Sequence, residues 1–237
     1  MCGRFVIKDD NPRNIQKYIE GVRLPTKLEP NFNTAPTQNI LGISASETGP
    51  YGQYYRWGLI PSWAKDPSIG TKMINARVET LSEKASFSNL LKTRRCLIPA
   101  SGFYEWRIEN GKKQPYYIHY SDQVVFFLGL WDYWKKEDSS IFSCTIITTQ
   151  SEAWMQQYHS RKPYATVDKE VIDTWLNPKI ENIFPFILES NRYPENMMKA
   201  FRVSKAINSV SFNSQEALLE MPLDLPKSRI GSLFFWD

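Results

Sequence analysis

Cysteine at position two has the most distinctive chemical potential in this sequence. If the initiator methionine is removed, Cys2 becomes the amino terminus and carries a primary amine and a thiol on adjacent carbons. Such a 1,2-aminothiol condenses with an aldehyde, because the amine forms an imine and the thiol then closes a five-membered thiazolidine ring. Unperturbed α-amino groups titrate at about 7.7–8.0 and thiols at about 8.5, so reactive fractions of both exist near neutral pH. Position alone favours a plainer interpretation, a small residue that leads into a strand.

Glu105 is a candidate for proton transfer. It lies in the aromatic segment 101–106 (SGFYEW), where partial burial would raise its pKa and allow it to exchange protons near neutral pH. Strand alternation could instead turn Glu105 toward solvent, on the same side as Phe103. The segment alone leaves these two alternatives open.

His159 is a second candidate for acid–base chemistry, at the end of an amphipathic helical segment. The cations Arg161 and Lys162 follow it, and neighbouring positive charge lowers the pKa of an imidazole and favours its neutral form. That form would suit proton transfer or contact with a sugar oxygen. A histidine at this place could equally hydrogen-bond a free carbonyl at the helix end. The other histidine, His119, alternates within a tyrosine-rich strand and is interpreted as structural.

Amide, guanidinium and indole side chains supply candidates for binding. Asn75 could present its amide to a carbonyl or hydroxyl, although structural asparagines do the same. Arginines can bind phosphates and tryptophans can stack on bases. Such residues are Arg4, Arg77, Arg161, the cluster Lys92, Arg94 and Arg95, and Trp57, Trp63 and Trp106. Singly none is specific, because scattered arginines are ordinary and tryptophan is usually a core residue.

Composition limits the remaining chemistry. The chain has 237 residues, 42% of them hydrophobic, with 29 Lys and Arg against 25 Asp and Glu and a net charge of +4. This length and apolar share suit a substantial core, and the charge permits an anionic partner without demanding one. Three cysteines without a CxxC motif and two histidines argue against a metal centre or a disulfide framework. Cys96 and Cys144 lie in β-like runs, where we expect buried, unreactive thiols. We therefore expect no metal and no cofactor.

The first ten residues (MCGRFVIKDD) have no apolar stretch and no small-residue cleavage site, so we expect no secretion. The longest apolar run, 124–130 (VVFFLGL), is too short to span a bilayer. We expect no membrane association and a soluble protein of a reducing compartment.

Short β-like runs dominate the middle of the chain and indicate antiparallel hairpins. The turn 109–111 (ENG) predicts a hairpin, and 116–120 followed by 121–122 and another apolar run predicts a second one. The β-like runs are 54–60, 96–99, 103–108, 116–120, 124–131 and 142–149.

Helical segments are interspersed between these runs. Predicted N-caps are Asn11 before Pro12, Ser82, Ser151 and Asp168. Further on, 194–201 suggests a helix and 210–212 a short β-like stretch. Hairpins mixed with single helices predict an α+β fold with a mostly antiparallel sheet.

Six segments, taken together and in order, resemble the SRAP (SOS response-associated peptidase) family of abasic-site processing proteins. The resemblance covers roughly residues 2–215, and it implies one domain with a barrel-like β core and several flanking helices, followed by an unassigned tail at 216–237. The segments are 1–5 (MCGRF), 33–38 (NTAPTQ), 57–63 (WGLIPSW), 75–80 (NARVET), 95–106 (RCLIPASGFYEW) and 159–163 (HSRKP).

The resemblance implies a DNA-repair protein that binds single-stranded DNA and crosslinks to abasic sites after autoproteolytic removal of residue one. By this likeness Cys2 attacks the ring-opened aldehyde and Asn75 holds the adduct. Glu105 shuttles protons, and His159 acts on the sugar oxygen. An associated lyase activity would follow from the imine. The expected DNA contacts are Arg4, Asn33, Pro36, Trp63, Arg77 and Arg161.

The sequence departs from the family pattern at Lys162, where an apolar methionine is common, so we expect an added cation beside the DNA groove. We also expect a monomer in the cytoplasm, associated with the nucleoid when bound to DNA.

Two other functions fit parts of the pattern. Cys2 and His159 could form the nucleophile and base of a cysteine hydrolase. The arginines and tryptophans could serve a non-catalytic single-strand DNA binder, whose affinity would fall as salt rises.

Overall fold

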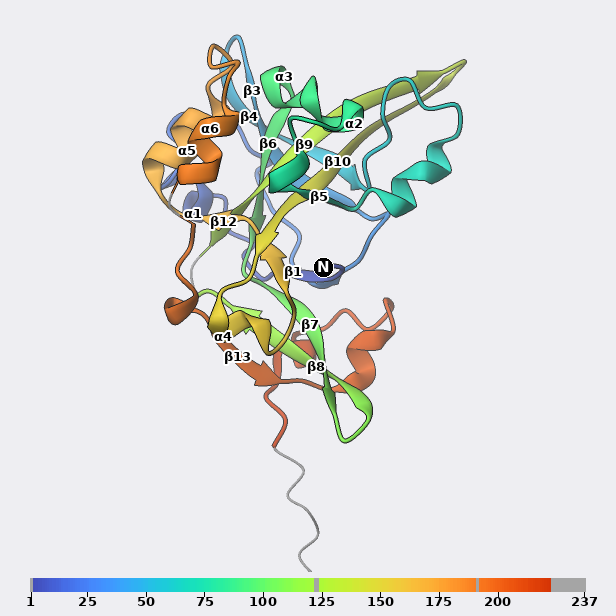
Figure 1. Ribbon diagram of the computed structural model, residues 1–237, viewed down its shortest axis with the longest axis vertical. Helices are drawn as coiled ribbons and strands as arrows, with labels where there is room; N and C mark the ends of the chain where they lie inside the picture. The colour runs from blue at the N-terminus through green and yellow to red at the C-terminus, as the bar shows by residue number, and fades with distance from the viewer. Residues whose placement is uncertain (1, 122–123, 191, 223–237) are drawn as a thin grey trace, which may run out of the picture.

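Two β-sheets, joined where the chain passes from β6 to β7, organise the computed structural model, which describes residues 2–121, 124–190 and 192–222 (Figure 1). The strands are β1 Phe5–Ile7, β2 Asn31–Thr34, β3 Asn39–Ser46, β4 Gly49–Trp57, β5 Asn75–Arg77, β6 Arg95–Ala100, β7 Gly102–Glu109, β8 Lys112–His119, β9 Val125–Lys136, β10 Ser139–Gln150, β11 Arg161–Pro163, β12 Ala165–Thr166 and β13 Lys199–Arg202.

Five strands of the larger sheet close a barrel. Strands β4, β3, β6, β9 and β10 pair antiparallel in that order, and β10 returns to pair in parallel with β4. Closure removes exposed strand edges. Beyond this ring, β5 pairs in parallel with β10 at Ile146–Thr148. Strand β11 pairs antiparallel with β10, and β12 pairs antiparallel with β9.

The smaller sheet has the strand order β13-β8-β7-β1-β2 and lies below the barrel in Figure 1. Strands β7 and β8 form the hairpin that was predicted at 109–111. Asn110 and Gly111 have φ values of 49° and 71°, the left-handed region that a tight two-residue hairpin turn requires. Only Ser101 separates β6 from β7, so one continuous segment connects the barrel to this sheet.

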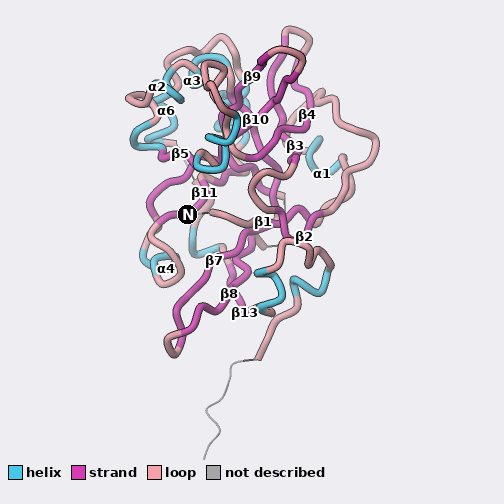
Figure 2. Tube along the Cα trace, turned by 90° about the vertical axis from the view of Figure 1, so that its right-hand side faces the viewer, coloured by secondary structure: helices cyan, strands magenta, loops and turns pink. Residues whose placement is uncertain are grey.

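Most helices pack around the barrel, whereas α4 lies apart from them and contacts β11 (Figure 2). The α-helices are α1 Arg13–Gln16, α2 Ala85–Ser88, α3 Leu90–Thr93, α4 Ala153–Gln156, α5 Lys169–Leu176 and α6 Phe184–Glu189. The 3-10 helices are η1 Pro67–Lys72, η2 Val78–Thr80, η3 Glu195–Met197, η4 Lys205–Asn208 and η5 Gln215–Leu218.

The predicted N-cap Asp168 is confirmed, and Asn11 makes a similar hydrogen bond although Pro12 occupies the N-cap position of α1. Asp168 Oδ1 accepts hydrogen bonds from the backbone of Glu170 and Val171 at the start of α5. Asn11 Oδ1 accepts one from Arg13 N at 3.0 Å, directly before α1. In both cases the capping oxygen lies two or three residues from the donors, so local sequence is enough to specify the cap.

Two other predicted N-caps are wrong. Ser82 does not cap its segment, since the chain turns before α2 and Lys84 occupies the N-cap position. Ser151 does not cap α4 either, because the carboxylate of Glu195 accepts from Glu152 N at 2.6 Å and from Met155 N at 2.9 Å. A residue more than 40 positions away thus supplies the cap.

The predicted hairpin between 116–120 and the following apolar run is also wrong. Strand β8 pairs with β7 and β13, whereas β9 belongs to the barrel. The chain leaves the smaller sheet at 120–124, of which 122–123 lie outside the described residues.

Near the end of the described chain, the predicted helix at 194–201 is instead η3 followed by β13, and 210–212 form a turn and not a strand. The predicted domain boundary at 215 falls inside η5, where Ala217 is fully buried.

The α+β, mostly antiparallel fold with a barrel-like core is confirmed. One core cluster lies between the barrel and the smaller sheet, and it brings Cys2 and Phe103 together with Trp57 and Cys144 of the barrel. Cys2 is therefore held where the two sheets meet. As predicted, Cys96 and Cys144 are buried, and both thiols are free.

Candidate active site

Cys2 lies just before β1 and is completely buried. Its Sγ atom approaches the Arg4 carbonyl oxygen at 3.8 Å, and its own carbonyl oxygen accepts a hydrogen bond from Asn75 Nδ2 at 2.8 Å. Burial raises the pKa of the thiol, and the negative charge of Glu105 raises it further. The thiol is therefore neutral at physiological pH in this closed arrangement.

Asn75 begins β5, whose parallel pairing with β10 sets Asn75 opposite Ile146. While the amide nitrogen holds the Cys2 backbone, the amide oxygen is buried without a hydrogen-bond partner among the described residues. An unpaired buried oxygen costs free energy. It is thus ready to accept a hydrogen bond from a group that binds beside Cys2.

Glu105 is 4% exposed on β7, so the alternative that it faces solvent is wrong. Burial raises its pKa to about 7. Since its charge acts on the Cys2 thiol, the two side chains are electrostatic neighbours. A carboxyl group with a pKa near 7 both donates and accepts protons efficiently at neutral pH.

His159 follows α4, and its position is fixed by the backbone of the next strand. Its Nδ1 atom accepts a hydrogen bond from Arg161 N at 2.9 Å, which places the proton of the neutral ring on Nε2. Burial lowers the pKa of His159, and the charge of Arg161 contributes further in the same direction. The lowered pKa favours the neutral imidazole, and burial is its main cause, ahead of the neighbouring cations.

Lys162 is buried and paired inside the protein, so the prediction of an added cation beside the DNA groove is wrong. Its side chain is 1% exposed, and its ammonium lies 2.8 Å from the Glu195 carboxylate and 3.5 Å from that of Glu152. Burial of a lysine requires such pairing. The departure from the family pattern is thus accommodated inside the protein.

Arg4 and Asn33 are joined in one hydrogen-bonded network. Arg4 Nη1 donates to Asn33 Oδ1 at 2.7 Å and to the Ile207 carbonyl at 2.8 Å. Asn33 is fully buried, and its Nδ2 donates to the carbonyls of Ile207, Ser209 and Phe212. Asn33 thereby fixes Arg4 and the segment 207–212.

The remaining predicted DNA contacts lie on β5, β11 and two loops. Arg77 is exposed at the end of β5, and Arg161 forms a two-pronged ion pair with Glu79 at 2.9 and 3.2 Å. Trp63 is 62% exposed and Pro36 is half-buried. Arg77, Trp63 and Pro36 can reach a ligand as they stand.

Several weaker candidates for binding nucleic acid have structural roles. Trp57 is buried and donates to the Ile74 carbonyl, and Trp106 donates to Asn208 Oδ1. Arg95 is 4% exposed, and its guanidinium donates to several backbone carbonyls around α3 and the end of α5. Arg94 pairs with Asp132. The indole N–H groups of both tryptophans and the guanidinium of Arg95 are thus used within the protein, and Arg94 uses Nη1 there.

Comparison with known proteins identifies the family to which this chain belongs. The family model for SOS response associated peptidase (SRAP) matches residues 1–210, most of the chain. The protein belongs to the SRAP family. Abasic site processing protein YoqW of Bacillus subtilis is 42% identical over 224 residues, covering 92% of this chain and 99% of the relative.

A more distant relative carries the same description. Abasic site processing protein HMCES of Xenopus tropicalis is 31% identical over 75% of this chain and 66% of its own length. Among solved structures, a protein from Bacteroides thetaiotaomicron superposes with a TM-score of 0.80 at 23% identity, over 93% of this chain and 100% of its own. That structure supports the fold.

Sequence reasoning missed two residues around the candidate site. Tyr120 is fully buried beside Cys2, and its hydroxyl has no hydrogen-bond partner among the described residues. Glu195 caps α4 ahead of His159. Tyr120 resembled an ordinary strand tyrosine, and Glu195 is far in sequence from α4, so neither gave a local signal.

Within the described residues, no helix is long and apolar enough to cross a membrane. The same residues contain no group of three or more His, Cys, Asp or Glu side chains arranged to hold a metal ion.

Proposed function

We propose that this SRAP-family protein processes abasic sites in single-stranded DNA by forming a covalent thiazolidine crosslink through Cys2. The observation that carries the proposal is the meeting of three groups: Cys2, the Asn75 amide bonded to its carbonyl, and the buried Glu105 whose pKa is about 7. The names of the relatives, abasic site processing proteins, support the same substrate.

The reaction joins the Cys2 α-amine to the aldehyde carbon of the ring-opened deoxyribose. The amine adds to the carbonyl to give a carbinolamine, which loses water to form an imine. The Cys2 sulfur then adds to the imine carbon, and the thiol proton passes to the nitrogen. Overall one C–N and one C–S bond form and one water leaves, so no oxidant, reductant or metal is required.

Glu105 is suited to move the protons in these steps. As an acid it protonates the carbinolamine hydroxyl so that water can leave, and as a carboxylate it accepts the proton of the thiol. The raised pKa of Cys2 makes this help necessary, since the buried thiol does not ionise by itself near pH 7. The same property argues against the cysteine-hydrolase alternative, which needs a thiolate.

Asn75 and His159 position the reacting groups in this proposal. Asn75 fixes Cys2 through its nitrogen, and its buried oxygen can receive the new N–H of the adduct. His159, protonated on Nε2 when neutral, would donate to the sugar oxygen and favour ring opening. From the imine, β-elimination would break the strand 3′ to the abasic site, which gives the associated lyase activity.

DNA binding in this proposal uses Arg4, Arg77 and Arg161 for phosphates and Pro36 and Trp63 for the channel wall. Asn33 contributes by holding Arg4. Arg161 must exchange part of its pairing with Glu79 for a phosphate oxygen. A monomeric protein acting on DNA in the cytoplasm accords with these roles.

The amine becomes available only after Met1 is removed, which we propose occurs by autoproteolysis. Hydrolysis of the Met1–Cys2 bond releases methionine and leaves the free aminothiol. Intact mass measurement of the purified protein reports this step directly.

The test is to incubate the processed protein with a single-stranded oligonucleotide that carries one abasic site and to examine the product on a denaturing gel and by mass. We expect one adduct whose mass is the sum of the two components less one water. Absence of a covalent species with fully processed protein would refute the proposal.

Two substitutions of Cys2 separate the chemical steps. Cys2→Ser, verified by mass to have lost Met1, keeps the amine, so borohydride should trap an imine adduct, but no stable product should survive without reductant. Cys2→Ala should likewise give an imine that borohydride traps and no stable product without reductant. Cys144→Ala, which alters another buried free thiol, should crosslink as the wild type does. If the protein bound intact and abasic single strands with equal affinity and formed no adduct, the alternative of a non-catalytic single-strand DNA binder would be favoured.

A further inference from the structure

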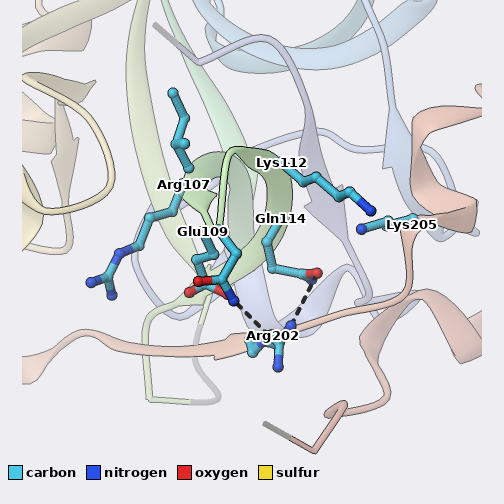
Figure 3. A pocket seen from close by; sticks show the side chains of 8 residues that line it. Arg107, Glu109, Lys112, Gln114, Arg202 and Lys205 are labelled. Atoms are coloured by element: carbon cyan, nitrogen blue, oxygen red, sulfur yellow. Dashed lines mark hydrogen bonds and ion pairs between the residues drawn. The ribbon is translucent and has the colours of Figure 1, made fainter. Parts of the chain in front are cut away.

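A basic cavity of about 560 Å³ lies at the tip of the β7–β8 hairpin, against η4 (Figure 3). It is separate from Cys2, Asn75 and His159. The cavity is lined by Arg107, Ile108, Glu109, Asn110, Lys112, Gln114, Arg202 and Lys205.

The single carboxylate in this lining is already neutralised. Glu109 accepts a hydrogen bond from the Tyr116 hydroxyl at 2.5 Å and lies 3.5 Å from the guanidinium of Arg202, which is 8% exposed. Arg202 also donates to Gln114 Oε1 at 3.4 Å. Arg202 and Glu109 compensate each other, and the Arg107 guanidinium extends away from the two lysines and donates to Gln157 Oε1 at 3.4 Å (Figure 3). The uncompensated charge that faces the cavity therefore comes from Lys112 and Lys205.

Lys112 and Lys205 extend toward one another from different elements, the first from β8 and the second from η4 (Figure 3). Neither ammonium forms an ion pair within the part of the chain that the structure describes. Two like charges that face each other repel, and an anion bound between them removes that repulsion. The arrangement therefore favours an anionic ligand.

The cavity adjoins the proposed path of DNA on two sides. Arg107 lies two residues beyond Glu105 on β7, so both residues share one face of the strand at a spacing of about 7 Å. On the other side, the carbonyls of Ile207 and Asn208 in η4 accept hydrogen bonds from Arg4. Lys205 begins the same short helix.

We infer that this cavity binds backbone phosphates of the DNA strand that enters the active site, at nucleotides beyond the abasic one. Lys112 pairs in register with Glu109, four residues along β7 from Glu105, a distance of about 13 Å. This inference rests on the proposed function for the identity of the strand. Phosphate is the class of ligand because the uncompensated charged groups of the lining are cations and the lining has no aromatic platform for a base.

The test compares Lys112→Gln/Lys205→Gln with a matched control, Lys17→Gln/Lys27→Gln. The control removes the same charge from exposed positions at and after the end of α1, which lies on the opposite side of the barrel from β11 (Figure 2). Equilibrium affinity for a long single-stranded oligonucleotide without an abasic site is measured between 50 and 200 mM salt. Loss of two phosphate contacts should make the slope of log affinity against log salt shallower by about 1.4, so the deficit of the variant shrinks about sevenfold over this range.

A slope equal to that of the control variant would overturn the inference. Binding of inorganic phosphate is measured separately by NMR titration. If the variant loses phosphate binding but keeps the salt slope of the control for DNA, the inference is also overturned, because the site would then bind a free anion and not DNA. A minimal abasic trinucleotide, too short to reach the cavity, should crosslink equally to the wild type and the variant. Failure of the wild type to crosslink would refute the proposed function, whereas the salt slopes test the cavity independently.

Discussion

The ammonium of Lys162 lies 2.8 Å from the carboxylate of Glu195, and both side chains are almost completely buried. Glu195 also accepts the backbone hydrogen bonds that start α4, while the neighbour of Lys162, Arg161, donates its backbone N–H to His159. One ion pair therefore fixes the segments on both sides of His159. It connects a charge buried in the core to the position of a proposed catalytic group.

Glu195→Ala should be strongly destabilising because it leaves the Lys162 ammonium buried without its close partner. We expect a loss of about 3–5 kcal/mol in the free energy of unfolding, measured by urea denaturation. The double variant Glu195→Gln/Lys162→Met should recover much of this loss, since it removes the unpaired charge.

Glu152→Gln is the matched control for this pair. Glu152 lies 3.5 Å from the same ammonium but its side chain is 66% exposed, so the substitution should cost less than about 1 kcal/mol. If the two single variants lose equal stability, the burial of Glu195 has no energetic consequence and the interpretation is wrong.

Local features of this structure were predictable and long-range ones were not. Asp168 and the 109–111 turn act within a few residues, so their sequence signals were sufficient. Glu195 caps α4 across 40 residues, and Lys162 is buried only because Glu195 is there. Likewise, β8 and β9 are adjacent in sequence but each finds its partners elsewhere, since strand pairing depends on the whole sheet.

The candidate site shows the same contrast between local features, which were predictable, and long-range features, which were not. Residue types and order identified Cys2, Asn75, Glu105 and His159, and the resemblance supplied their proposed roles. The burial that sets the pKa of Glu105 arises from packing between two sheets, and no local pattern decided it.

Glu105 should make both stability and crosslinking depend on pH. Its pKa is about 7 in the folded protein, against an ordinary 4.5, so the folded state binds its proton more tightly than the unfolded state. The stability that Glu105 contributes is fully present below about pH 4.5 and is lost as pH rises through 7. The total change is about 3 kcal/mol.

Urea unfolding of wild type and Glu105→Gln at several pH values between 4.5 and 8 measures this difference. The difference in stability should grow with pH in favour of the variant. In crosslinking, the wild-type rate should have an inflection near pH 7 that Glu105→Gln lacks. A constant difference in stability across this range would contradict the assigned pKa.

Asn33→Ala should release the segment 207–212 from the core. It removes three hydrogen bonds to backbone carbonyls and leaves buried groups unpaired, so we expect a loss of about 1–3 kcal/mol. Amide exchange should accelerate in this segment before it does in the barrel. Asn39→Ala, at an exposed position of β3, should change stability by less than about 0.5 kcal/mol.

The same substitution tests how Asn33 takes part in DNA binding. Because Asn33 holds Arg4, the losses of DNA affinity from Asn33→Ala and Arg4→Ala should be strongly non-additive in a double-mutant cycle. Additive losses would mean that Asn33 contacts DNA independently of Arg4.

Trp63→Ala should weaken binding of single-stranded DNA without affecting the fold. The indole is 62% exposed, so its removal leaves no cavity, and stability should stay within about 0.5 kcal/mol of the wild type. Loss of one base–aromatic stack should reduce affinity by about 1–3 kcal/mol, measured by fluorescence anisotropy. Trp63→Phe should retain part of the affinity, because a smaller ring still stacks.

Tyr54→Ala, which removes another exposed aromatic ring at 46% exposure, should leave affinity unchanged. Equal losses from Trp63→Ala and Tyr54→Ala would indicate nonspecific aromatic contact, and the DNA channel could not then be assigned to the loop that carries Trp63.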